Sequence, residues 1–198
     1  SEFTVLEDGR PQQLRMFERG GLPLQVMLFL DVSSSMRFVF PKVQDAAIEF
    51  LTQLGPRDVA SVVGFADNVQ ILQVFTGDHH ALVKAVRQAK PRGKTTLFNA
   101  LYVGLNELNR PGGDAQTIPR RRVAVLLTDG DDTASLVRFE DLMDFARRTN
   151  IAIYAIRLIG RAPAPNDTGV SQYILNQLTR QTRGRAFLSV ADKDLGPV

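Results

Sequence analysis

The chain has 198 residues, of which 44% are hydrophobic, which is enough for one substantial core and short for two. Its net charge of +3 is small and its arginines are mostly scattered, so the charge balance does not indicate a nucleic-acid-binding surface. No run of about 18 apolar residues is present, which argues against insertion into a membrane, and zero cysteines exclude disulfides and thiolate metal sites.

The N-terminal segment differs in pattern from the rest of the chain. Residues 3–19 predict two short strands around Glu-Asp-Gly-Arg, with Asp8-Gly9 as the turn. Glycines and a proline then separate this segment from a long apolar run. We therefore expect an N-terminal β-hairpin extension over residues 1–21 and a single domain over residues 22–198.

From residue 24 onwards, strands alternate with helices. The continuous apolar run at 24–30 is typical of a strand that is buried on both faces. Strands at 59–66 and 69–75 are joined by only two residues, so they must be antiparallel, because a parallel pair needs a crossover of a dozen or more residues. The alternation predicts a doubly wound, mostly parallel α/β sheet with helices on both faces. The other expected elements are helices at 41–54, about 78–90, 97–108, about 136–149 and about 170–182, and strands at 123–127, 151–158 and 186–190.

Oxygen-bearing side chains follow two of the buried strands. Asp31, Ser33 and Ser35 come after the first strand, and Asp129 follows the strand at 123–127, while Thr95 lies in a short loop between two helices. In open α/β sheets the functional crevice lies beyond the carboxyl ends of the strands, where the chain order reverses. Hard oxygen donors select cations such as Mg²⁺, Mn²⁺ or Ca²⁺. If the two strands are neighbours, these residues predict a site for a divalent cation.

Three motifs together resemble one known family. Asp-x-Ser-x-Ser at the end of an apolar strand, Gly-x-Thr before a helix reading LFNAL, and LLTDG after a later strand are similar to the von Willebrand factor A (VWA) domain. Nearly the whole chain takes part, and FTVLEDGRPQQ, LPLQVMLFLDVSSSM and VAVLLTDGDDTAS resemble a bacterial subfamily described as VWFA-related. The resemblance implies a six-stranded sheet with the order 3-2-1-4-5-6, in which the third strand is antiparallel.

The same resemblance implies a metal-ion-dependent adhesion site (MIDAS). Ser33 and Ser35 would ligate the cation through their hydroxyls, and Thr95 would do so directly or through water. Asp31 and Asp129 would hold coordinated waters. Neutral hydroxyls and water-mediated carboxylates leave a divalent ion under-neutralised, so a Glu or Asp of a protein partner can complete its coordination. Binding of the ion and binding of the partner would then be reciprocally coupled. The preferred ion would be Mg²⁺, with Mn²⁺ and Ca²⁺ as alternatives, and the site would bind its partner without catalysing a reaction.

The segment DGDDT at 129–133 also fits an enzymatic alternative. It matches the Asp-x-Asp-x-Thr signature of haloacid dehalogenase-like phosphatases, in which Asp129 would be the nucleophile and Asp131 the general acid, with Mg²⁺ neutralising the phosphate. That family normally carries the motif near its N-terminus, and this interpretation leaves DVSSSM unexplained. In the adhesion interpretation, Asp131 and Asp132 are rim charges that hold waters or cap the following helix.

Two further interpretations need no working metal site. The domain could be a scaffold or assembly module that uses other surfaces and has a vestigial site. A minor alternative is that the segment after Asp31 is a hydroxyl-rich loop that caps the helix at residue 41, with Asp31 as a turn former. Related bacterial proteins are often exported, so the resemblance weakly favours a periplasmic or secreted location. The sequence itself does not identify the compartment.

Overall fold

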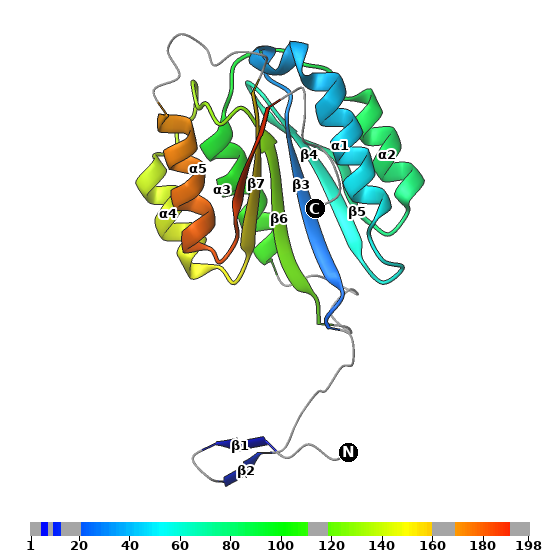
Figure 1. Cartoon of the computed structure of the whole chain (residues 1–198), viewed down its shortest axis with the longest axis vertical. Helices are drawn as coiled ribbons and strands as arrows, with labels where there is room; N and C mark the ends of the chain where they lie inside the picture. Colours follow the sequence, from blue (N-terminus) through cyan, green and yellow to red (C-terminus); the bar gives the residue numbers. More distant parts are fainter. Residues whose placement is uncertain (1–4, 8–9, 13–20, 111–118, 160–168, 191–198) are drawn as a thin grey trace.

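A six-stranded mixed sheet forms the centre of the molecule (Figure 1). The computed structural model describes residues 5–7, 10–12, 21–110, 119–159 and 169–190. The strands of this sheet are β3 (Leu24–Asp31), β4 (Val59–Phe65), β5 (Val69–Thr76), β6 (Arg121–Thr128), β7 (Ala152–Ile159) and β8 (Ala186–Val190). Their order is β5-β4-β3-β6-β7-β8, with β4 and β5 antiparallel and all other neighbours parallel. Both the expected strand order and the antiparallel pair are confirmed.

Helices cover both faces of the sheet, as the alternating pattern predicted. The described helices are α1 (Phe40–Thr52), α2 (His79–Gln88), α3 (Leu97–Asn109), α4 (Phe139–Arg148), α5 (Val170–Gln181) and the short 3-10 helix η1 (Ser34–Phe38). In Figure 1, α1 and α2 lie on one side of the sheet, and α3, α4 and α5 lie on the other. The sequence did not indicate η1, because five residues are too few to show a periodic pattern.

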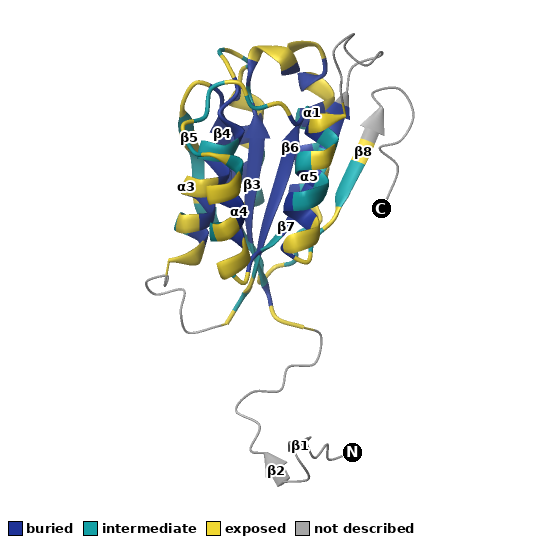
Figure 2. Cartoon of the chain, turned by 90° about the vertical axis from the view of Figure 1, so that its left-hand side faces the viewer, coloured by how far each residue is buried: buried dark blue, intermediate teal, exposed yellow. Residues whose placement is uncertain are grey.

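The central strand β3 has side chains in two hydrophobic cores. Val26 and Leu28 pack on the side of α1 and α2, whereas Met27 and Phe29 pack on the side of α3, α4 and α5. This alternation explains the unbroken apolar run, because both faces of the strand are dry. Figure 2 shows the central strands buried and the outer faces of the helices exposed. On α3, a Cβ added at Gly104 would overlap the ring of Phe29, so glycine lets this helix approach the sheet closely.

The N-terminal segment forms the expected pair of short strands. β1 (Val5–Glu7) pairs with β2 (Arg10–Gln12) in the antiparallel direction. The predicted turn at Asp8-Gly9 lies outside the described residues, and the boundary of the extension at residue 21 stays a prediction. Among the helices that the structure describes, none is long and apolar enough to cross a lipid bilayer.

Candidate metal centre

Asp31 lies fully buried at the carboxyl end of β3, and both of its carboxylate oxygens accept hydrogen bonds. Its Oδ1 accepts the backbone N–H of Ser33 at 3.0 Å, and its Oδ2 accepts the hydroxyl of Thr128 at 2.6 Å. Thr128 ends the neighbouring strand β6, and its hydroxyl oxygen accepts the N–H of Gly130 at 3.0 Å. Adjacent parallel strands thus fix the position of Asp31 and of the loop that follows β6.

Two serine hydroxyls of the same loop lie beside the carboxylates. The Oγ atoms of Ser33 and Ser35 are 2.9 Å apart, with Ser33 buried and Ser35 exposed. The Ser35 side chain also hydrogen-bonds Asp129, which lies half-buried after β6 and accepts the N–H of Asp131 at 3.2 Å. The structure therefore brings together four of the five predicted site residues, namely Asp31, Ser33, Ser35 and Asp129.

The loop that carries Thr95 is hydrogen-bonded to both of the other loops. The carbonyl of Gly93 accepts the N–H of Ser34 at 3.0 Å. On the other side, the N–H of Thr95 donates to the hydroxyl of Thr133 at 3.0 Å, and its carbonyl accepts the N–H groups of Thr133 and Ala134 at 3.0 Å each. The Thr95 side chain is 3% exposed, and its hydroxyl makes no hydrogen bond to another residue in the part of the chain that the structure describes. Three loops distant in sequence thus meet at one edge of the sheet.

Gly93 has a conformation and surroundings that only glycine fits. Its φ is +74°, and an added Cβ would overlap the carboxylate of Asp67. The Oδ1 of Asp67 accepts the N–H of Lys94 at 2.9 Å, so this carboxylate holds the loop just before Thr95. The Lys94 side chain is exposed, as expected from the sequence.

Burial and charge repulsion act on the two carboxylates. Burial raises the pKa of Asp31 to about 7, with the nearby charge of Asp129 adding to the rise and the hydrogen bonds from Ser33 and Thr128 opposing it. Burial also raises the pKa of Asp129, and its hydrogen bond with Ser35 opposes that rise. The charge of Asp129 thus destabilises the charged form of Asp31, and a cation held between the loops would offset this repulsion.

Sequence reasoning gave no role to two residues that support this site. Thr128 immediately precedes Asp129, and a hydroxyl at the last position of a buried strand was the available signal. Arg157 is a buried arginine within the apolar strand β7, and its Nε donates to the carbonyl of Asp129 at 2.8 Å. Its position opposite Thr128 follows from the pairing of β6 with β7, which the sequence alone does not give.

The predicted role of Asp132 as a cap of the following helix is wrong. Its Oδ1 accepts the N–H of Phe98 at 3.2 Å, in the first turn of the preceding helix α3, and the hydroxyl of Ser135 at 2.6 Å. The following helix α4 begins after Arg138, which gives it no side-chain cap. The loop folds back across the start of α3, and this tertiary contact is not visible in the local sequence. Asp131, the other rim charge, accepts a hydrogen bond from the hydroxyl of Ser171 at the start of α5.

The donor set fits a hard cation. The described residues contain no group of three or more His, Cys, Asp or Glu side chains placed to hold a metal, so any ion here would depend on hydroxyls and waters. Mg²⁺ binds oxygen at about 2.0–2.1 Å in octahedral geometry, which puts adjacent ligands about 2.9 Å apart. The Oγ atoms of Ser33 and Ser35 are separated by 2.9 Å, which matches that spacing.

Comparison with known proteins now identifies the family. A family model described as "von Willebrand factor type A domain" matches residues 26–131, which include all five candidate residues. The chain belongs to this family. A relative described as "UPF0353 protein", from Mycolicibacterium paratuberculosis (strain ATCC BAA-968 / K-10), is 31% identical over an alignment of 116 residues that covers 54% of this chain and 34% of the relative. The chain therefore spans about a third of that relative's length.

Solved structures show the same fold at low sequence identity. BatB from Bacteroides thetaiotaomicron has a TM-score of 0.68 and 14% identity, covering 84% of this chain and 90% of its own. The pilus adhesin SpaC from Lactobacillus rhamnosus GG has a TM-score of 0.69 and 14% identity, over 88% of this chain and 29% of SpaC. The vWF domain of the type V pili tip protein Mfa5 from Porphyromonas gingivalis has a TM-score of 0.68 and 11% identity, over 86% of this chain and 90% of that one.

Proposed function

We propose that this VWA domain binds a protein partner through a divalent cation, without catalysing a reaction. The preferred cation is Mg²⁺, with Mn²⁺ and Ca²⁺ as alternatives. Domains of this family are often adhesion or protein-interaction modules, and two of the neighbours named above are pilus proteins. The observation that carries the proposal is the pair of hydroxyls at ligand spacing, Ser33 and Ser35, beside the buried carboxylate of Asp31 and the half-buried carboxylate of Asp129.

The five residues divide into two roles. Ser33, Ser35 and Thr95 offer neutral hydroxyl oxygens as ligands, whereas Asp31 and Asp129 accept hydrogen bonds from waters on the ion. When bound, a divalent cation supplies the positive charge to which a Glu or Asp carboxylate of the partner coordinates. Because the hydroxyl ligands carry no charge, the centre keeps its attraction for an external carboxylate. The affinity for the ion and the affinity for the acidic partner therefore rise together.

Isothermal titration calorimetry with Mg²⁺ and a short Gly/Ser peptide bearing one Glu tests this function. We expect the peptide to raise the affinity for Mg²⁺, EDTA to abolish peptide binding, and Asp31→Ala to abolish both. Asp45→Ala is the matched control, since Asp45 is an exposed carboxylate on α1 outside the three loops. Peptide binding that survives EDTA and Asp31→Ala in a folded protein would instead favour the scaffold function with a vestigial site.

The phosphatase interpretation receives no support from the third loop. Asp131, which would be the general acid, accepts a hydrogen bond from Ser171, and DVSSSM belongs to the same cluster as Asp129. That interpretation predicts Mg²⁺-dependent hydrolysis of a generic phosphate ester such as p-nitrophenyl phosphate, with loss of turnover in Asp129→Asn. We expect no turnover by the Mg²⁺-loaded protein. An extracytoplasmic location likewise stays a prediction.

A further inference from the structure

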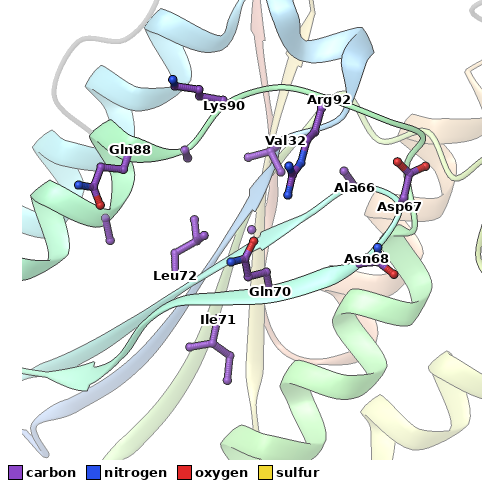
Figure 3. Close-up of a pocket in the computed structure, with 13 residues that line it drawn as sticks. Val32, Ala66, Asp67, Asn68, Gln70, Ile71, Leu72, Gln88, Lys90 and Arg92 are labelled. Carbon is purple, nitrogen blue, oxygen red and sulfur yellow. The ribbon is translucent and has the colours of Figure 1, made fainter.

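A cavity of about 720 Å³ lies between the β4–β5 hairpin and the end of α2 (Figure 3). Its size falls within the range of about 300–1,000 Å³ that is usual for ligand pockets. Small side chains leave this space open, because Ala66, just after β4, and Ala85 and Ala89, at the end of α2, line it. The side chain of Leu72 packs against Gly64. The cavity therefore arises from the residue types that line it and needs no movement to form.

One cationic side chain enters this cavity without a countercharge. Figure 3 shows the guanidinium of Arg92 pointing into the cavity above Gln70, while the Lys90 amine points outward at the rim. The acidic residue of the lining, Asp67, points away from Arg92 and is hydrogen-bonded to the N–H of Lys94. Arg92 makes no ion pair with any residue that the structure describes. The charge of the cavity is thus complementary to a carboxylate.

The cavity lies next to the candidate metal centre. Val32, which lies between Asp31 and Ser33, lines the cavity, and its carbonyl accepts the N–H of Arg92 at 2.7 Å. Arg92 precedes Thr95 by three residues, and three residues span at most about 11 Å of extended chain. A peptide segment of similar length can therefore reach from the metal centre to the cavity.

We propose that this cavity binds a second acidic residue of the partner, two to four residues from the one that coordinates the cation. This inference rests on the proposed function and specifies its partner as an extended segment with two carboxylates. The second carboxylate forms a charge-assisted hydrogen bond with Arg92, and the chain between the two acidic residues crosses Val32. Linking two contacts in one segment makes the second contact intramolecular, so it raises affinity without needing to be strong alone.

Fluorescence anisotropy with labelled Gly/Ser peptides tests the inference in the full chain with Mg²⁺ present. One peptide has a single Glu, and the others have a second Glu placed two, three or four residues away. At the best spacing we expect the second Glu to increase affinity about tenfold. Only the two-Glu peptides should shift the amide resonances of Gly64, Asn68 and Gln70, which line the cavity.

Two variants separate the charge of the cavity from its shape. Arg92→Gln should reduce the gain from the second Glu to about twofold or less, and Ala89→Leu should do the same by filling the space, while binding of the one-Glu peptide persists in both. Arg87→Gln is the matched control, because Arg87 is an exposed arginine in the last turn of α2 that does not line the cavity. It should keep the full gain.

The outcomes distinguish the inference from the function on which it rests. If the one-Glu peptide binds in a Mg²⁺-dependent manner but no spacing gives a gain, the inference is wrong and the proposed function stands. A gain that persists in Arg92→Gln or Ala89→Leu also overturns the inference, since the second carboxylate then binds elsewhere. If the one-Glu peptide binds equally well in EDTA, the proposed function fails and the inference fails with it.

Discussion

The candidate metal centre and the adjacent cavity share Val32 but differ in how their polar groups are held. In the metal centre, both oxygens of Asp31 accept hydrogen bonds and backbone contacts connect all three loops. In the cavity, Arg92 is exposed and small residues leave open space around it. A rigid site suits a cation with strict coordination geometry, whereas an open cavity can accommodate a partner side chain in several conformations. Substitutions that disturb the contacts between the loops of the metal centre should therefore affect stability and binding together, whereas substitutions in the cavity should affect binding alone.

The largest effect on binding is expected from a ligand hydroxyl that contributes little to the fold. Ser33→Ala removes one proposed ligand, whose Oγ lies 2.9 Å from the Oγ of Ser35 and hydrogen-bonds the carboxylate of Asp31. We expect the affinity for Mg²⁺ in the presence of the one-Glu peptide to fall about 100-fold, at the upper end of losses caused by changes around metal sites. The free energy of unfolding without metal should change by less than about 1 kcal/mol. Calorimetry and urea denaturation measure the two quantities.

Ser34→Ala is the control for that experiment. Ser34 lies in the same loop with its side chain exposed, and its contact with the carbonyl of Gly93 uses the backbone N–H, which alanine keeps. Its affinity for Mg²⁺ should stay within about twofold of the unmodified protein, since no ligand is lost. Equal losses in Ser33→Ala and Ser34→Ala would show that the loop tolerates no change and that hydroxyl ligation is not the cause.

Gly93→Ala should disturb the loop that precedes Thr95 and so lower both stability and binding. The positive φ costs about 1–2 kcal/mol for alanine, and displacing Asp67 costs about 1 kcal/mol more by breaking its hydrogen bond to Lys94. We expect a loss of about 2–3 kcal/mol in unfolding free energy by urea denaturation, with peptide affinity reduced about tenfold. Gly21→Ala is matched to it, because Gly21 has a φ of +82° but nothing within 4 Å of an added Cβ. A similar loss in both variants would mean that Asp67 does not hold the loop.

A smaller effect should follow from removing a hydrogen bond that holds the backbone of Thr95, without substituting Thr95 itself. Thr133→Val removes the hydroxyl that accepts the N–H of Thr95, while the backbone hydrogen bonds between the two residues remain. We expect a loss of about 1 kcal/mol in unfolding free energy and a threefold to fivefold loss of Mg²⁺-dependent peptide binding. Thr149→Val removes a hydroxyl that donates to the carbonyl of Ala146 at the end of α4, and should lower stability without affecting binding. If both variants bind equally, the Thr133 contact does not position Thr95.

The sequence predicted the sheet well because its signals are local or follow from chain length. Alternating strands and helices indicated the parallel sheet, and the two-residue connection at Asp67-Asn68 required the antiparallel pair. The positions of Asp31 and Asp129 at strand ends predicted their proximity once the strand order was known. Roles that depend on long-range packing were missed. Asp132 caps a helix that precedes it in the chain, and Arg157 reaches the Asp129 loop from β7.

The smallest expected effect is that of salt, which should weaken binding in the cavity more than binding at the metal centre. Arg92 is exposed, so its attraction for a carboxylate is screened as the Debye length falls from about 10 Å at 0.1 M salt to about 3 Å at 1 M. Coordination beside the buried side chains of Asp31, Ser33 and Thr95 is screened less, because less solvent separates the charges there. We expect the gain from the second Glu to fall from about tenfold to about threefold over that range in NaCl, measured as the ratio of the two peptide affinities. A ratio that stays constant with salt would mean that the second carboxylate does not bind Arg92, because an attraction to an exposed guanidinium must weaken as salt rises.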